Sequence, residues 1–176
     1  NIMILLLVGI LLWSLSHGVK RIAPAHRKAL GNRGKILTTA GILLGLILMI
    51  IGYQQAELIL IWSPPKFLRH LNNFLMLLSV ASFAAAHSKS RFRRLLRHPM
   101  LTSVKIWAIA HLLVNGDLAS ILLFGSMLLW AVWTVVQLNR AENWQRPEPG
   151  NPKRDWLFVV ITLAVFTVIS GIHVWL

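Results

Sequence analysis

Histidines carry most of the side-chain chemistry that this sequence offers, because the chain has seven of them and no cysteine. Without cysteine, thiolate catalysis, iron–sulfur clusters and disulfides are excluded. The acidic residues all lie in expected loops or at helix ends, and they are Glu57, Asp117, Glu142, Glu148 and Asp155. Zinc catalysis, which usually adds a carboxylate or a thiolate to histidine, is therefore disfavoured. Neutral imidazoles are left as the candidate chemical groups.

His111 is the histidine that lies deepest in an apolar segment, within "KIWAIAHLLVNGD". Trp107, His111 and Asn115 are spaced by four residues and so share one face of a helix. An imidazole inside hydrocarbon needs a hydrogen-bond acceptor, a metal or a water-filled cavity. The structural alternative is an interhelical hydrogen bond that helps packing, worth about 1 kcal/mol.

The other histidines stand nearer the ends of apolar runs. His17, His87 and His98 are expected on the side of the basic loops, and His70 on the opposite side. His26 lies in a basic loop and is expected to be solvated, and His173 is expected at the interface. Histidines on at least three helices of so short a chain make a shared site an alternative of equal weight to separate packing roles.

Haem iron is the centre that such a histidine set suits best. Imidazoles that project from two antiparallel helices into an apolar pocket are ligands for haem. Lys105 and the arginines of the third loop offer positive charge for its propionates at the membrane edge. A c-type haem is excluded, because its attachment motif contains two cysteines.

The elements that must position these histidines are membrane-spanning helices. Hydrophobic residues make up 56% of the 176 residues, and the mean hydropathy is +0.66. Apolar runs long enough to cross a bilayer predict an all-α polytopic membrane protein, a single domain over residues 1–176 with a bundle of about six transmembrane helices. The predicted spans are Ile2–His17, Ile36–Tyr53, His70–His87, Met100–Val114, Leu118–Leu138 and Trp156–Trp175.

Local signals refine two of these boundaries. The second helix has room to continue as far as Trp62, because Pro64 and Pro65 are the residues that must stop it. The triplet Asn115-Gly116-Asp117 predicts a tight turn, in which Asp117 caps the next helix through its side-chain oxygen.

The basic residues set the orientation. Loops one, three and five carry Lys20, Arg21, Arg27, Lys28, Arg33 and Lys35; Lys89, Arg91, Arg93, Arg94 and Arg97; and Arg140, Arg146, Lys153 and Arg154. The even loops carry only Lys66 and Arg69. The positive-inside rule places the odd loops in the cytoplasm and both termini on the far side, which in a bacterial inner membrane is the periplasm. This pattern also explains the net charge of +13 without nucleic acid as a partner.

The chain resembles the NnrU-like membrane protein family, which is related to plant and cyanobacterial 15-cis-zeta-carotene isomerase. The resemblance is carried by "LSHG", "IWSPPKFLRHL", "RHPM" and "KIWAIAHLLVNGDLAS" and extends over about Ile2 to Leu138. It implies a bundle of about six helices. The isomerase branch binds haem b through histidines, and redox-dependent ligation permits cis–trans isomerisation of a carotenoid double bond. The NnrU branch is linked to denitrification, in nitric oxide or nitrite reduction.

The resemblance also implies site residues. The ligand of the first helix matches His17 and that of the fourth helix matches His111, whereas His98 matches a further histidine upstream and His70 the histidine of "LRHL". Two axial ligands of one iron lie only about 4 Å apart, since each metal–imidazole bond is roughly 2 Å. If Lys105 marks the cytoplasmic boundary, His111 is only about 9 Å deep and can meet His17. Otherwise His70 is the better partner for His111.

The leading hypothesis is thus an inner-membrane haem b protein with His17 and His111 as metal ligands, serving nitric oxide or nitrite reduction or the isomerisation of a carotenoid-like polyene. The first alternative is a non-enzymatic assembly or stability factor for nitric oxide reductase, with the histidines as packing groups. A small-solute transporter is a third possibility, disfavoured because no acidic residue lies within a span.

Overall fold

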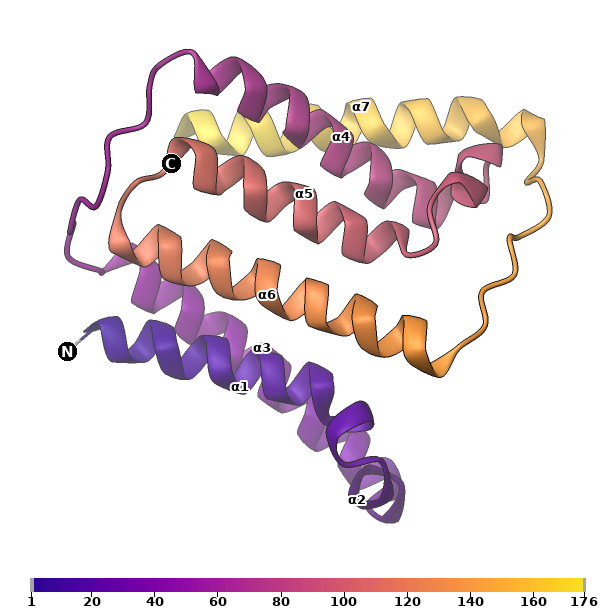
Figure 1. Cartoon of the computed structure of the whole chain (residues 1–176), viewed down its shortest axis with the longest axis horizontal. Coiled ribbons are helices and arrows are strands. Elements are labelled where there is room, and N and C mark those ends of the chain that lie inside the picture. Colours follow the sequence, from indigo (N-terminus) through magenta and orange to yellow (C-terminus); the bar gives the residue numbers. More distant parts are fainter. Residues whose placement is uncertain (1, 176) are drawn as a thin grey trace. The chain divides into compact units, whose positions relative to one another are not determined.

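The computed structural model describes residues 2–175, and the described chain is built from helices (Figure 1). The long helices are α1 (Ile2–Ile22), α3 (Gly31–Gln54), α4 (Leu68–Ser88), α5 (Pro99–Val114), α6 (Leu118–Ala141) and α7 (Asp155–Trp175). Shorter ones are α2 (Pro24–Ala29), η1 (Arg91–Leu95) and η2 (Pro152–Arg154). The all-helical membrane fold predicted from the apolar runs is confirmed.

Not every long helix has the composition of a membrane span. By length and composition, α1, α3, α6 and the stretch Pro152–Val174 can cross a bilayer. Helix α5 is apolar but has only 16 residues, and α4 carries several polar residues near its start. The predicted count of about six spans is therefore approximate. Many large apolar side chains are exposed along the helices, such as Leu129 at 73%, as expected of surfaces that face lipid.

Each predicted span coincides with a helix, and two boundaries are informative. Helix α1 continues five residues beyond His17 to Ile22, so His17 lies more than a turn inside the helix. Helix α3 ends at Gln54. The extension of this helix to Trp62 is therefore wrong, and the short α2 falls in a region that was expected to be a loop.

The chain forms two compact units, which are described separately. The first contains Asn1–Ser63 and Asn115–Trp130, and the second contains Pro64–Val114 and Ala131–Leu176. Helix α6 contributes its first part to one unit and its remainder to the other.

The first unit is held together by close contact between the backbones of α1 and α3. A Cβ atom on Gly45 would lie 2.7 Å from the backbone nitrogen of Trp13, and one on Gly9 would lie 2.6 Å from that of Met49. Both distances are too short for a side chain. Gly41 and Gly45 are four residues apart, a spacing of small residues that lets membrane helices approach closely.

Gly45→Ala should therefore destabilise the protein, although alanine is intrinsically the better helix former. Overpacking of this kind costs about 1–3 kcal/mol. The thermal unfolding midpoint in detergent measures the effect. Gly125→Ala is the matched control, because it adds the same Cβ in the same unit where nothing lies within 4 Å. Equal midpoints for the two variants would contradict the close contact.

The connection between α3 and α4 is irregular but fixed by backbone hydrogen bonds to the turn between α5 and α6. The amides of Ile61 and Trp62 donate to the carbonyl of Gly116, at 2.8 and 3.1 Å. The amide of Leu118 donates to the carbonyl of Ile59 at 2.8 Å. Glycine is required in this turn because the carbonyl of Trp62 stands where a Cβ atom of residue 116 would lie.

Asp117 caps α6, as predicted. Its Oδ1 accepts a hydrogen bond from the amide of Ser120 at 2.8 Å, and its Oδ2 accepts from the hydroxyl of Ser120 at 2.6 Å. Because that hydroxyl donates to Asp117, the hydroxyl of Tyr53, 2.9 Å away, must donate to it in turn. The cap thus joins the start of α6 to α3.

In the second unit, α4 packs against both α5 and α7 (Figure 1). The buried residues of α4 are small or short, namely Ser79, Val80, Ser82, Ala84, Ala85 and Ser88. The Ser79 hydroxyl donates to the carbonyl of Ser103 on α5 at 2.9 Å. This covering explains why α4 is less apolar than the other long helices.

The short helix η1 is fastened to the beginning of α7. The Arg91 guanidinium forms a salt bridge with Asp155 at 2.6 Å, and its Nε donates to the same carboxylate at 2.7 Å. The ring of Phe92 stacks on that of Phe158, with centres 4.4 Å apart. These contacts bring the third and fifth basic loops to the same end of the second unit.

Candidate histidine site

His17 lies in the first unit, packed against two tryptophans. The centre of its ring is 3.9 Å from that of Trp13 and 5.5 Å from that of Trp130. Its Nδ1 lies 3.2 Å from the carbonyl oxygen of Trp13. Since a carbonyl only accepts, Nδ1 carries the proton and the lone pair of the ring is on Nε2. A neutral imidazole in this tautomer is ready to ligate a metal through Nε2.

Trp130 adds an unsatisfied donor beside His17. Its Nε1 is buried and has no hydrogen-bond partner among the described residues. Buried polar atoms are nearly always paired, so such an atom calls for an explanation. An acceptor oxygen on a bound group would satisfy it.

His111 lies near the end of α5, in the second unit, and repeats the local arrangement of His17. Its Nδ1 donates to the carbonyl of Trp107 at 2.9 Å, and the two ring centres are 5.3 Å apart. The sequences "WSLSH" and "WAIAH" thus place a tryptophan four residues before each of the two histidines. This repeated Trp-x-x-x-His pattern is a signal in the sequence that the analysis of single histidines missed.

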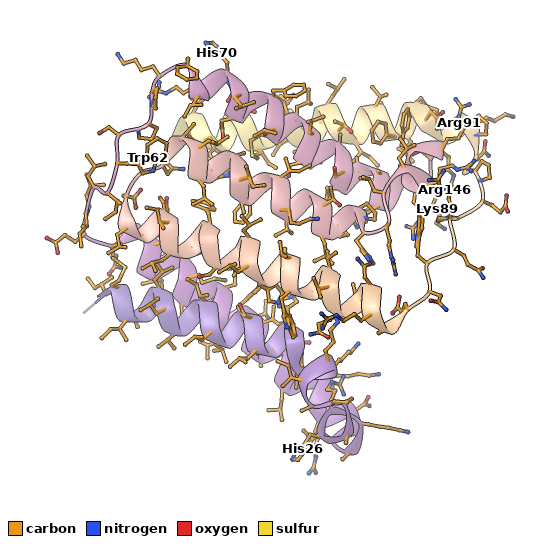
Figure 2. All side chains as sticks on the ribbon, viewed as in Figure 1. His26, Trp62, His70, Lys89, Arg91 and Arg146 are labelled. Carbon is orange, nitrogen blue, oxygen red and sulfur yellow. The ribbon has the colours of Figure 1, made fainter. Side chains whose placement is uncertain are left out.

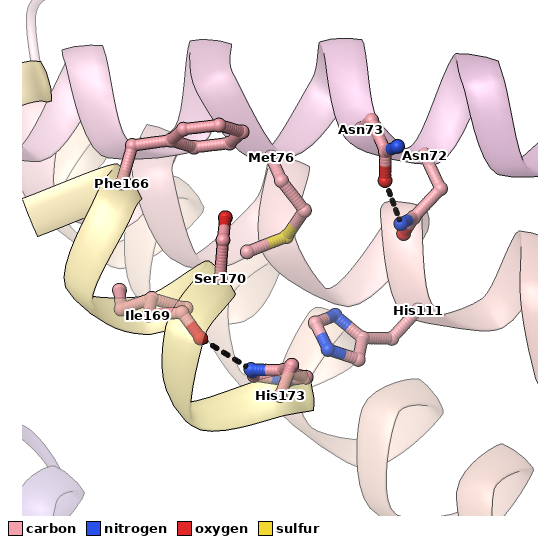
Figure 3. Close-up of a pocket in the computed structure, with 8 residues that line it drawn as sticks. All are labelled: Asn72, Asn73, Met76, His111, Phe166, Ile169, Ser170 and His173. Carbon is pink, nitrogen blue, oxygen red and sulfur yellow. Dashed lines mark hydrogen bonds between the residues drawn. The ribbon is translucent and has the colours of Figure 1, made fainter. Parts of the chain in front are cut away.

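A cavity of about 320 Å³ adjoins His111 (Figure 3). It is lined by Asn72, Asn73, Met76, His111, Phe166, Ile169, Ser170 and His173. The Asn72 amide donates to Oδ1 of Asn73 at 3.3 Å, whereas Oδ1 of Asn72 is buried and unpartnered among the described residues. The cavity therefore combines apolar walls with neutral hydrogen-bonding groups.

The neighbour of His111 across this cavity is His173 of α7, with ring centres 6.1 Å apart (Figure 3). From the sequence, His173 was expected to lie at the membrane interface. Its predicted depth in the membrane, which is similar to that of His111, could have identified it. The fourth and sixth predicted spans run in the same direction, and His111 and His173 are three and two residues from the ends of their helices.

The predicted pair His17 and His111 is divided between the two units. His70 is exposed near the start of α4, at the end of the second unit opposite Lys89 and Arg91 (Figure 2). His70 and His111 belong to the same unit, but His70 is not among the residues that line the cavity.

The two remaining predicted site residues belong to the second unit. His98 precedes α5 and donates from Nε2 to Oδ1 of Asn139 at 2.9 Å, a bond that ties the start of α5 to α6. Lys105 lies on α5 and is partly exposed. A role for either residue in binding a cofactor stays a prediction.

A second cavity, of about 210 Å³, continues from the first inside the same unit. It is lined by Met76, Ser79, Val80, Phe83, Ser103, Val104, Trp107, Val165 and Ile169. Met76 and Ile169 line both cavities and so separate them. Methionine is flexible, and a movement of Met76 would join the two into one largely apolar slot along α4, α5 and α7.

The fold and the histidine geometry can be set beside known proteins. The family model described as "NnrU protein" matches residues 5–176. No curated protein and no solved structure matches the chain. The chain therefore belongs to the NnrU protein family.

Proposed function

We propose that this NnrU family member is a haem b protein of the bacterial inner membrane that serves nitric oxide or nitrite reduction. The observation that carries the proposal is the local geometry that His111 has in common with His17. Each is fixed by a bond from Nδ1 to the carbonyl of a tryptophan four residues earlier. Such a bond sets the tautomer and the ring orientation of a metal-ligating histidine.

The surroundings of both imidazoles fit a tetrapyrrole. The rings of Trp13, Trp130 and Trp107 give large apolar surfaces next to the histidines. Among the described residues, the buried Nε1 of Trp130 is a donor without a partner and would suit a carboxylate oxygen, whereas the unpartnered atom of Asn72 is the acceptor Oδ1. The resemblance assigns His17 as the second ligand beside His111.

When bound, haem would supply a redox-active iron, as the binding of nitric oxide or the isomerisation of a polyene requires. His111 would hold the iron, and the carbonyl of Trp107 keeps the ring proton on Nδ1. Apolar side chains such as Phe166 would exclude water. These tasks are the same for a nitrogen oxide and for a carotenoid-like polyene.

A second candidate function is a non-enzymatic assembly or stability factor for nitric oxide reductase. The observation in its favour is that the half-buried His17 ring packs on Trp13 and Trp130, whose rings also contact each other, so that its contacts are those of a packing residue. On this alternative the histidines serve helix packing alone, and the protein binds its partner through lipid-facing helix surfaces.

An absorption spectrum of the protein, purified after expression with adequate haem supply, separates the two functions. We expect a Soret band in the oxidised protein and a shifted band after reduction, because imidazole-ligated haem absorbs strongly in both states. His26→Ala should leave both spectra unchanged, since His26 is exposed on α2. The absence of a Soret band, together with co-purification of nitric oxide reductase, would favour the assembly factor.

A further inference from the structure

Helices α5 and α7 bring two histidines together at one end of the second unit. The ring centres of His111 and His173 are 6.1 Å apart, and their planes are inclined by 54° (Figure 3). Two imidazoles on opposite sides of one iron have centres about 6 Å apart, because two metal–nitrogen bonds of roughly 2 Å are extended by about 1 Å to each ring centre. The observed separation therefore matches that of an axial pair.

Backbone hydrogen bonds also orient the two rings in the same way. Nδ1 of His111 donates to the carbonyl of Trp107, and Nδ1 of His173 donates to the carbonyl of Ile169, both at 2.9 Å. Each bond places the ring proton on Nδ1 and the lone pair on Nε2. This is the orientation by backbone carbonyl that metal-ligating histidines commonly have.

We infer that His173 is the second axial ligand of the haem, so that the iron is bound entirely within the second unit by α5 and α7. The inference rests on the proposed haem function and replaces only the ligand that the resemblance assigns, His17. His17 then keeps the packing role that its contacts with Trp13 and Trp130 describe.

The cavities of the second unit provide the space beside this pair. Met76, Phe166 and Ile169 give the nearer cavity apolar walls, and Met76 and Ile169 also line the apolar cavity beside it. Polar groups gather in the nearer cavity, where the unpartnered Oδ1 of Asn72 and the hydroxyl of Ser170 lie. The lining of the nearer cavity thus offers a macrocycle apolar contacts and uncharged hydrogen-bonding groups. No charged side chain lines either cavity among the described residues.

The test compares single variants of His173, His17 and His87 in the haem-loaded, full-length protein. His87 is the matched control, because it makes the same bond from Nδ1 to a carbonyl four residues earlier, that of Phe83 at 2.9 Å, but is not among the residues that line the two cavities. Optical and electron paramagnetic resonance spectra report the spin state of the ferric iron. Two axial imidazoles give a low-spin signal, and loss of one gives a high-spin signal.

We expect His173→Ala to convert the iron from low spin to high spin and added imidazole to restore the low-spin signal. His17→Ala and His87→Ala should remain low spin. His173→Gln, which keeps a polar side chain of similar size, covers the case in which the alanine variant fails to fold. A low-spin spectrum in the His173 variants, with conversion in His17→Ala, would overturn the inference and leave the haem function intact. A wild-type protein without any Soret band would overturn both.

Discussion

His111→Ala is expected to remove nearly all of the Soret absorbance of the purified protein. His111 is the proposed iron ligand whether the second ligand is His17 or His173, so its loss affects both assignments. Removal of an outer-shell partner of a metal ligand already costs about 10–100-fold in affinity, and removal of the ligand itself should cost at least as much. Haem content per protein, measured from the pyridine haemochrome, gives the size of the effect.

Two controls separate ligand loss from misfolding. His70→Ala changes a histidine of the same unit that is exposed at the start of α4, and it should retain full haem content. The far-ultraviolet circular dichroism of His111→Ala should match that of the wild type, because a single alanine on α5 leaves the helices intact. If His111→Ala keeps its Soret band and its low-spin spectrum, the haem site proposed around α5 does not exist.

The second prediction concerns the orientation of the protein in the membrane. Because the sequence contains no cysteine, a single introduced thiol can be labelled specifically. Leu58→Cys, between α3 and α4, and Leu95→Cys, at the end of η1, each introduce a single thiol at a position with an exposed side chain, 80% and 68% respectively. The positive-inside rule assigns the first segment to the periplasm and the second to the cytoplasm. We expect a membrane-impermeant maleimide to label Leu58→Cys in spheroplasts and to label Leu95→Cys only after lysis.

The unmodified protein is the negative control for this experiment, because its sequence contains no cysteine to react. Labelling of both variants after lysis shows that each thiol is accessible to the reagent. The reverse pattern, with Leu95→Cys labelled in spheroplasts, would place the basic loops outside and invert the topology proposed here.

The helices of this protein could be predicted closely because membrane spans have a strong signal. Each apolar run coincides with a helix, and the cap at Asp117 was evident from its local sequence. The end of α3 could not be predicted, because it depends on hydrogen bonds between Ile59–Trp62 and a turn more than fifty residues later in the chain. Such pairing has no local signature.

The kind of chemistry at the candidate site could be predicted from the sequence, but the set of residues that form the site could not. His111 followed from its depth in an apolar run, and its bond to Trp107 gives it a backbone partner as predicted for a buried imidazole. His173 was not found, because a histidine near the end of a span usually lies at the interface. Its significance comes from the packing of α4 against both α5 and α7, and single-residue reasoning does not reveal which helices become neighbours.

The hydrogen bonds that Ile61 and Trp62 make to Gly116 also bear on how the protein is made. The first unit needs Asn115–Trp130, which the ribosome delivers only after α4 and α5 have been synthesised. Helices α1 and α3, which contact each other through their glycines, must therefore be in the membrane before this later segment is inserted. The first unit is thus completed only after α4 and α5 of the second unit have been synthesised.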